Sequence, residues 1–112
     1  MRASERIAAE VTSWEGVTSG PHAFGGVEFR LGRRELGHLH GDRLADLPFP
    51  KRERDRLIAE GRAREHRWVP DSGWLSVDLR EDGDVDTVIG LFRQAYQRAA
   101  KARSARSGSA RR

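Results

Sequence analysis

The stretch VEFRLGRRELGHLH, residues 27–40, contains the clearest structural pattern in the chain. Apolar and charged side chains alternate over residues 27–31, which is typical of a strand that buries one face. Gly32 comes next and tolerates a positive φ, which favours a tight turn. The chain then returns over residues 35–40, and we expect this segment to pair antiparallel with residues 27–31.

The rest of the chain predicts helices and further strands around this hairpin. Ile7, Val11 and Trp14 recur at helical spacing, and a longer apolar stripe follows Asp84, which can cap its helix. We expect, in chain order, a helix over 3–14, strands over 27–31 and 35–40, a weaker strand over 42–47, a helix over 51–60, a strand over 74–79 and a final helix. This order predicts an α+β domain: a small antiparallel sheet of about four strands, with the N-terminal, middle and C-terminal helices mainly on one face.

Charge is distributed unevenly along the chain. Hydrophobic residues make up 37% and charged residues 34%, but the apolar residues are periodic, so general disorder is not expected. The net charge is +4; residues 101–112 hold five basic residues and no acid, which leaves −1 for residues 1–100. We predict a single domain over 1–100 and a basic, disordered tail over 101–112. The tail either aids solubility or weakly attracts nucleic acid or an acidic partner.

Several classes of protein are excluded by composition. The chain has no cysteine, which excludes disulfides, thiolate metal sites and cysteine nucleophiles. No stretch approaches the ~20 apolar residues of a membrane span, and residues 1–14 lack the apolar centre of a signal peptide. We therefore expect a cytoplasmic protein without membrane contact.

Two histidines at the end of the hairpin indicate a candidate site. His38 and His40 are one residue apart, so a strand points both side chains to the same face. Two imidazoles so placed can share a divalent metal ion if other ligands join them; we expect His66 as the third, with His22 a more distant contributor. Glu35 projects to the opposite face of a regular strand, and it joins the group only through a bulge or from the strand's end.

The same histidines also fit acid–base chemistry without a metal. His38 or His40 is then the general base, and Asp42, which has the same parity along the strand, orients it. The alternative is that these residues simply form the polar outer face of a sheet.

Other residues near the histidines in the predicted fold are candidates for a pocket or an interface. Trp74 falls on the polar face of its strand. There it either forms a pocket wall or a protein contact, or it is covered by the loop of residues 62–70. The full predicted set is Glu35, Arg43, Trp68 and Trp74.

Two segments, GGVEFRLGRRELGHLHGDRLADLPFP (25–50) and GRAREHRWVPDSGWLSVDLR (61–80), resemble the luciferase domain family, small proteins of unknown function despite that name. The resemblance covers roughly residues 10–98, and its most specific part is the Glu-x-x-His-x-His run followed by Gly61 and His66. It implies no light emission, because nothing in the chain looks like a flavin or luciferin site. Longer relatives have a further histidine in the segment that corresponds to 41–47; this chain has none there, so His66 is the expected substitute. Residues 74–99 also resemble the end of the YjbR-like α+β fold.

Two classes of function stay open at this point. The first is a small-molecule or metal-binding domain with a histidine-lined site on the sheet; its cofactor is unknown, with a divalent metal ion as the candidate. The second is a non-catalytic interaction module that meets a protein partner, or a second copy of itself as a homodimer, through the face around Trp74. Nucleic acid is expected to bind only weakly and through the tail, because acidic residues offset the arginines of the 51–64 segment.

Overall fold

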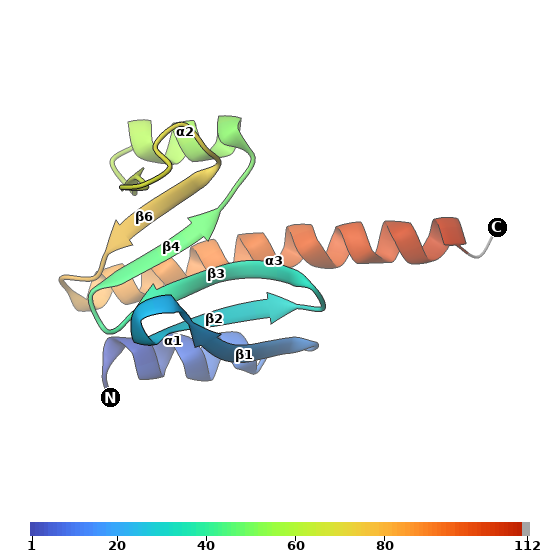
Figure 1. Cartoon of the computed structure of the whole chain (residues 1–112), viewed down its shortest axis with the longest axis horizontal. Helices are drawn as coiled ribbons and strands as arrows, with labels where there is room; N and C mark the ends of the chain where they lie inside the picture. The colour runs from blue at the N-terminus through green and yellow to red at the C-terminus, as the bar shows by residue number, and fades with distance from the viewer. Residues whose placement is uncertain (111–112) are drawn as a thin grey trace.

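The computed structural model describes residues 1–110, with the side chains of residues 1–106, and consists of helices packed on a six-stranded antiparallel sheet (Figure 1). Its elements are α1 (Ala3–Thr12), β1 (Val17–His22), a 3-10 turn (Ala23–Gly25), β2 (Gly26–Leu31), β3 (Arg34–His40), β4 (Leu44–Pro48), α2 (Lys51–Ala59), β5 (Arg64–Glu65), β6 (Trp74–Asp78) and α3 (Asp82–Ala110). The strand order is β1-β2-β3-β4-β6-β5, and every neighbouring pair is antiparallel.

The predicted hairpin is present, and the sheet is larger than expected. Leu31 faces Arg34 across a two-residue turn in which Gly32 has φ 63°. The prediction of about four strands misses the two edge strands, β1 and β5. The segment of β1 contains Pro21, and proline usually interrupts a strand, but an edge strand tolerates it because one of its sides needs no ladder partner.

A β-bulge interrupts the β2–β3 pair. Phe29 lies opposite Gly37, but the next residue of β2, Arg30, lies opposite Glu35, so Leu36 is an extra residue in β3. Leu36 is buried in the core, and Gly37 adopts φ 151°. The extra residue changes the alternation of β3, so that Glu35 and His38 meet on one face of the sheet.

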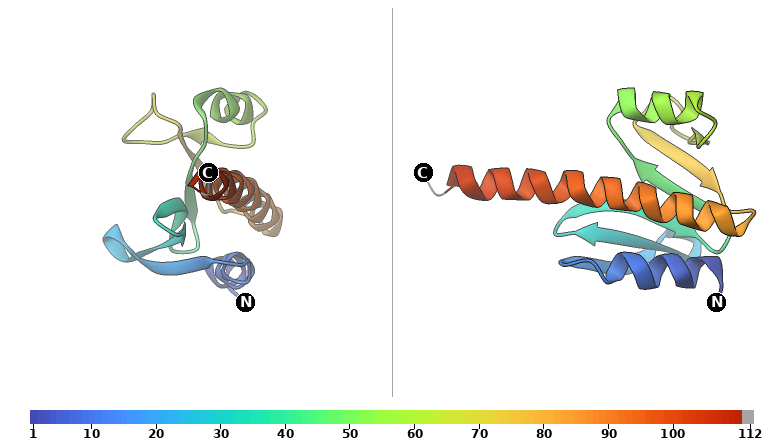
Figure 2. Two further views of the ribbon diagram at one scale, coloured as in Figure 1. Left: turned by 90° about the vertical axis from the view of Figure 1, so that its right-hand side faces the viewer. Right: turned by 180° about the vertical axis from the view of Figure 1, so that it is seen from behind.

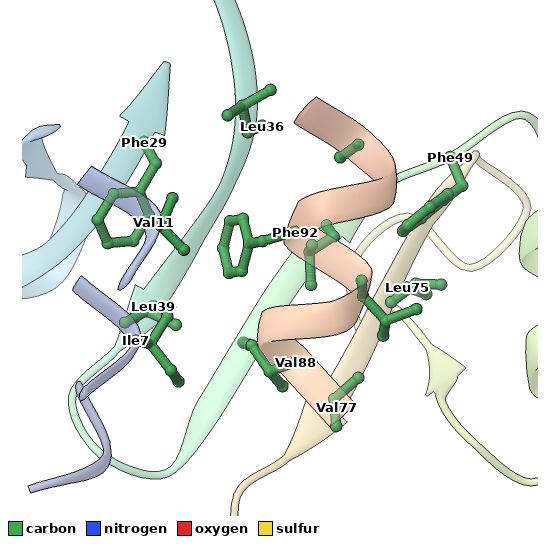
Figure 3. Close-up of a cluster of buried hydrophobic side chains, with 14 of the residues drawn as sticks. Ile7, Val11, Phe29, Leu36, Leu39, Phe49, Leu75, Val77, Val88 and Phe92 are labelled. Atoms are coloured by element: carbon green, nitrogen blue, oxygen red, sulfur yellow. The ribbon is translucent and has the colours of Figure 1, made fainter. Parts of the chain in front are cut away.

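All three helices lie on the same side of the sheet, as predicted (Figure 2, left). Phe29 of β2 packs edge-to-face on Phe92 of α3, with ring centroids 5.4 Å apart. Side chains of α1, α3 and the strands interleave around this pair (Figure 3). The helices thus bury one face of the sheet and leave the other face for polar side chains.

The C-terminal helix begins earlier than predicted. Asp84 is its third residue rather than its cap: Asp84 Oδ2 accepts hydrogen bonds from the backbone N–H groups of Arg80 (2.7 Å) and Glu81 (2.9 Å), which precede the helix. α3 continues to Ala110 and extends past the sheet (Figure 1), over a segment whose composition predicts disorder. Residues 111–112 of that segment lie outside the described residues, and the tail's behaviour in solution stays a prediction. None of the described helices has the length and apolarity needed to cross a membrane.

Candidate histidine–carboxylate site

The sheet face opposite the helices carries a cluster of histidines and carboxylates. Neighbouring strands contribute to it because their cross-strand partners share a face; for example, His38 of β3 lies opposite Asp46 of β4, which lies opposite Ser76 of β6. The cluster consists of His22, Glu28, Glu35, His38, His40, Asp46, His66 and Ser76.

Asp46 is the centre of the cluster. Its Oδ2 atom lies 3.2 Å from His38 Nε2, 3.1 Å from His40 Nε2 and 3.4 Å from His66 Nε2. Its Oδ1 atom accepts a hydrogen bond from Ser76 Oγ at 2.6 Å. Burial opposes the charge of this side chain, which is only 2% exposed, but the hydrogen bonds from His38 and Ser76 outweigh burial and lower the pKa of Asp46 to about 2. Asp46 is therefore a buried carboxylate.

His38 is held between two carboxylates. Its Nδ1 atom donates to Glu35 Oε2 at 2.6 Å, and its Nε2 atom faces Asp46. Burial disfavours a charged ring, but the hydrogen bonds to Asp46 and Glu35 prevail and raise the pKa of His38 to about 9. His38 is thus an imidazolium at neutral pH, and both of its N–H groups are used inside the cluster.

This arrangement predicts a specific pH dependence of stability. The pKa of His38 is 6.5 in the unfolded chain and about 9 in the folded one, so the stabilisation is complete below pH 6.5 and is lost as the pH rises to 9. We expect the unfolding free energy to fall by about 2 kcal/mol over this range, after a discount for solvent screening. For Asp46, whose pKa falls from 3.8 to about 2, stability is lost as the pH falls through that interval. Urea unfolding at pH 2–9 measures both effects.

A His38→Gln variant is the control for this prediction. It has no group that titrates at this position, so the fall between pH 6.5 and 9 should be about 2 kcal/mol smaller than in the parent chain. Parallel curves for the two proteins over this range would contradict the assignment.

His66 and His22 have further partners besides the residues around Asp46. His66 Nδ1 accepts a hydrogen bond from the backbone N–H of Trp68 (3.2 Å), so a neutral His66 carries its proton on Nε2, the atom that faces Asp46. His22 stacks on His38 with ring centroids 3.7 Å apart, and its Nδ1 donates to Glu28 Oε1 at 3.0 Å. His22 therefore extends the cluster onto the edge strand.

A pocket of about 380 Å³ opens from this cluster. Asp46, His40, His66 and Ser76 line it together with Phe24, Leu44, Arg64, Arg67 and Trp68. Trp74 is half-buried behind the cluster, with its ring centroid 5.3 Å from that of His38 and 6.2 Å from that of His66. It supports the imidazoles and does not stand free on the sheet face.

The structure brings together some of the residues predicted from sequence and separates others. His38, His40 and His66 meet at Asp46, Glu35 joins them through the bulge, and Trp68 lines the pocket.

Asp42 and Arg43 lie elsewhere. Asp42 Oδ1 accepts hydrogen bonds from Ser4 N–H (2.9 Å) and Ser4 Oγ (2.5 Å) at the start of α1, and the side chain of Arg43 is exposed and does not line the pocket. The carboxylate that holds the imidazoles is Asp46 instead of Asp42.

Two important residues are missed by sequence reasoning. Asp46 was detectable, because a short turn after His40 pairs His40 with Leu44 and therefore His38 with Asp46. Arg54 was not: it is buried on α2, and its guanidinium donates to the carbonyls of Trp74 (3.2 Å) and Pro70. Arg54 thereby ties down the loop that carries His66 and Trp68.

A scan against protein-family models matches residues 33–95, more than half of the chain, to the model described as Luciferase domain. The matched part contains Glu35, His38, His40, Asp46 and His66. The corresponding searches of curated proteins and of solved structures find no match to this chain.

Proposed function

Because the chain belongs to the luciferase domain family, and because the matched part carries the imidazoles that surround Asp46, we propose that it is a small-molecule-binding domain. One observation carries the proposal: three imidazole Nε2 atoms converge on a single buried carboxylate oxygen at the floor of an open pocket. The family's name brings no light-emitting activity to this chain.

The pocket has the size and composition expected of such a site. Its volume of about 380 Å³ falls within the range of pockets that hold small organic molecules, and its lining combines aromatic and aliphatic side chains with a few convergent polar groups. Asp46, whose pKa is lowered, lies at the floor and bonds to His38, whose pKa is raised; groups with displaced pKa values gather at functional sites.

Within the pocket, His40 is the residue best placed to contact a ligand. Asp46 accepts hydrogen bonds from His38, His40 and Ser76, and both ring nitrogens of His38 face carboxylates, so neither side chain is open to a ligand. His40 is partly exposed, and Asp46 engages its Nε2 only, which leaves Nδ1 for a ligand. The same ring is the one through which a bound molecule would exchange a proton with the cluster.

We expect a His40→Asn variant to bind ligands about tenfold more weakly, because it removes the imidazole contact while most of the cluster remains. The measurement is a screen of a chemically diverse set of small molecules against ¹⁵N-labelled protein, with the imidazole and backbone signals of the pocket residues as the readout. Ligands found with the parent chain are then titrated into the variant.

An Asp42→Asn variant is the matched control. Asp42 is predicted from sequence to orient a histidine, but the structure places it against Ser4 and away from the pocket. It should retain the affinity of the parent chain. The proposal fails if no compound moves the signals of His40 or His66, or if Asp42→Asn weakens binding as much as His40→Asn does.

A divalent cation is the second candidate ligand, and one observation favours it. Ring nitrogens of His22, His38 and His40 lie within 4.8 Å of one another. Because both nitrogens of His38 face carboxylates, a metal bound there displaces a proton from that ring. Calorimetric titration with Zn²⁺ at pH 6 and pH 8 tests this alternative: such a site binds one equivalent, more tightly at pH 8, and is lost in His22→Asn but kept in His66→Asn.

A further inference from the structure

Two loops from opposite ends of the sheet meet above the pocket. The 3-10 turn at residues 23–25 joins β1 to β2 at one edge, and the loop that follows β5 leads into β6 at the other. Both extend to the side of the sheet opposite the helices (Figure 2, left). At their tips the rings of Phe24 and Trp68 lie 6.4 Å apart between centroids, and both residues line the pocket. The mouth of the pocket therefore has an aromatic surface on two sides.

Phe24 contributes little to the stability of the fold. Its side chain is 89% exposed, so it buries almost no apolar surface, and its φ of 59° is unfavourable for a residue with a bulky side chain. Its neighbour Gly25 also has a positive φ, of 76°. An exposed aromatic side chain on strained backbone at the mouth of a pocket indicates a role in contacting a ligand.

Trp68 repeats this pattern from the other loop. It is 62% exposed, although Arg54 holds the following residues firmly through the carbonyl of Pro70. The guanidinium of Arg67 lies 4.9 Å from the centroid of the Trp68 ring, so a positive charge is positioned next to the aromatic surface. An aromatic ring and a cation thus stand together at the rim.

The accessible polar groups of the pocket are mainly basic. His40, His66, Arg64 and Arg67 line it, and its acidic lining residue, Asp46, is buried and accepts hydrogen bonds from His38, His40 and Ser76. Arg64 is neutralised by a bidentate ion pair with Asp78, at 2.7 and 3.0 Å. The guanidinium of Arg67 at the rim therefore presents N–H donors and a positive charge to a ligand, and it favours an anionic group.

We infer that the ligand of this site is a planar, conjugated ring that bears an anionic group, a carboxylate or a phosphate. The ring packs against Phe24 and Trp68, and the anion pairs with the guanidinium of Arg67 beside them. This inference rests on the proposed small-molecule function and names the chemical class of the ligand. The pocket's volume accommodates one or two fused rings.

Three matched probes test the inference: 2-naphthoate, the neutral alcohol 2-naphthalenemethanol, and the saturated acid decalin-2-carboxylate. Tryptophan fluorescence and the imidazole NMR signals report binding. We expect 2-naphthoate to bind about tenfold more tightly than either of the others, since only this probe has both the flat ring and the charge. Benzyl phosphate against benzyl alcohol repeats the comparison for phosphate.

Variants at the rim provide the second arm. Phe24→Asn and Arg67→Gln should each weaken the binding of 2-naphthoate about fivefold or more. Arg33 is an exposed arginine in the β2–β3 turn, so Arg33→Gln should leave the affinity unchanged. Asparagine tolerates the left-handed conformation of residue 24, so Phe24→Asn should keep the thermal stability of the parent chain.

The outcomes separate this inference from the proposed function. The ligand class is wrong if the neutral or the saturated probe binds as tightly as 2-naphthoate. It is also wrong if Phe24→Asn and Arg67→Gln bind 2-naphthoate as tightly as the parent chain does. In either case other compounds can still shift the imidazole signals, and the proposed function then stands. If 2-naphthoate and benzyl phosphate leave those signals unmoved at millimolar concentration, the ligand class is also wrong. The proposed function itself fails only if no compound of the diverse screen shifts the imidazole signals either.

Discussion

A Gly37→Ala substitution is expected to lower the unfolding free energy by about 4 kcal/mol or to prevent folding. A Cβ atom at this position would lie 2.7 Å from the carbonyl oxygen of Asp46, 2.8 Å from the Phe92 ring and 3.0 Å from Leu47 Cγ. Two of these neighbours are side chains of the packed core and the third is backbone, so none can move away at low cost. The φ of 151° adds backbone strain for any residue with a side chain.

The measurement is urea unfolding of Gly37→Ala beside Gly20→Ala. Gly20 also lies in a strand, but a Cβ atom there meets nothing within 4 Å, so its replacement should change the unfolding free energy by less than about 0.5 kcal/mol. Equal stability of the two variants would show that the bulge at residues 36–37 is not packed as described. The bulge also sets the position of Glu35 against His38, so a folded Gly37→Ala protein should have a lower His38 pKa in NMR titration.

An Asp46→Ala substitution is the second change with a large expected effect. It removes the acceptor of the Ser76 hydroxyl and of the His38 and His40 imidazoles, and the carboxylate oxygen that lies 3.4 Å from His66 Nε2. It leaves the His38 imidazolium with Glu35 as its remaining carboxylate partner. Loss of one partner of a buried charged network costs about 3–5 kcal/mol, because the groups left behind stay desolvated. We expect a loss in that range near pH 6, where His38 is charged in the folded chain.

Asp78→Asn is the matched control for this experiment. Asp78 forms its ion pair with Arg64 at the surface, so its loss should cost less than about 1 kcal/mol. If Asp46→Ala costs no more than Asp78→Asn, Asp46 is not the central acceptor of the cluster. NMR titration of the imidazoles gives an independent test, because the pKa of His38 should fall towards 6.5 in Asp46→Ala.

The elements with strong periodicity were predictable from the chain alone. The alternation over residues 27–31 and the glycine that follows specify the β2–β3 hairpin, and the apolar stripes of α1 and α3 specify which faces pack on the sheet. The edge strand β1 was not predictable in this way, because its residues, VTSGPH, have neither clear alternation nor strand-forming composition. Its strand conformation depends on pairing with β2, an interaction between two segments that the sequence of β1 alone does not reveal.

The site was predicted only in part, for a similar reason. The shared face of His38 and His40 follows from their spacing in a strand, which is a local property. The choice between Asp42 and Asp46 depends on the register of β3 against β4, and that register pairs His38 with Asp46. The alternation of side chains along a single strand would place Asp42 on the same face as His38 and His40. However, Asp42 follows the end of β3 and its side chain bonds to Ser4.

Local side-chain order in this protein is thus enough to specify the fold class, the hairpin and two of the histidines, because helical and strand periodicities arise from backbone geometry within one segment. The bulge that turns Glu35 towards His38, the acidic residue that gathers the imidazoles, and the meeting of Phe24 with Trp68 above them all depend on packing between distant segments. Such contacts are set by how buried side chains fill the core and how the sheet brings its edges together, and no short stretch of residues contains that information.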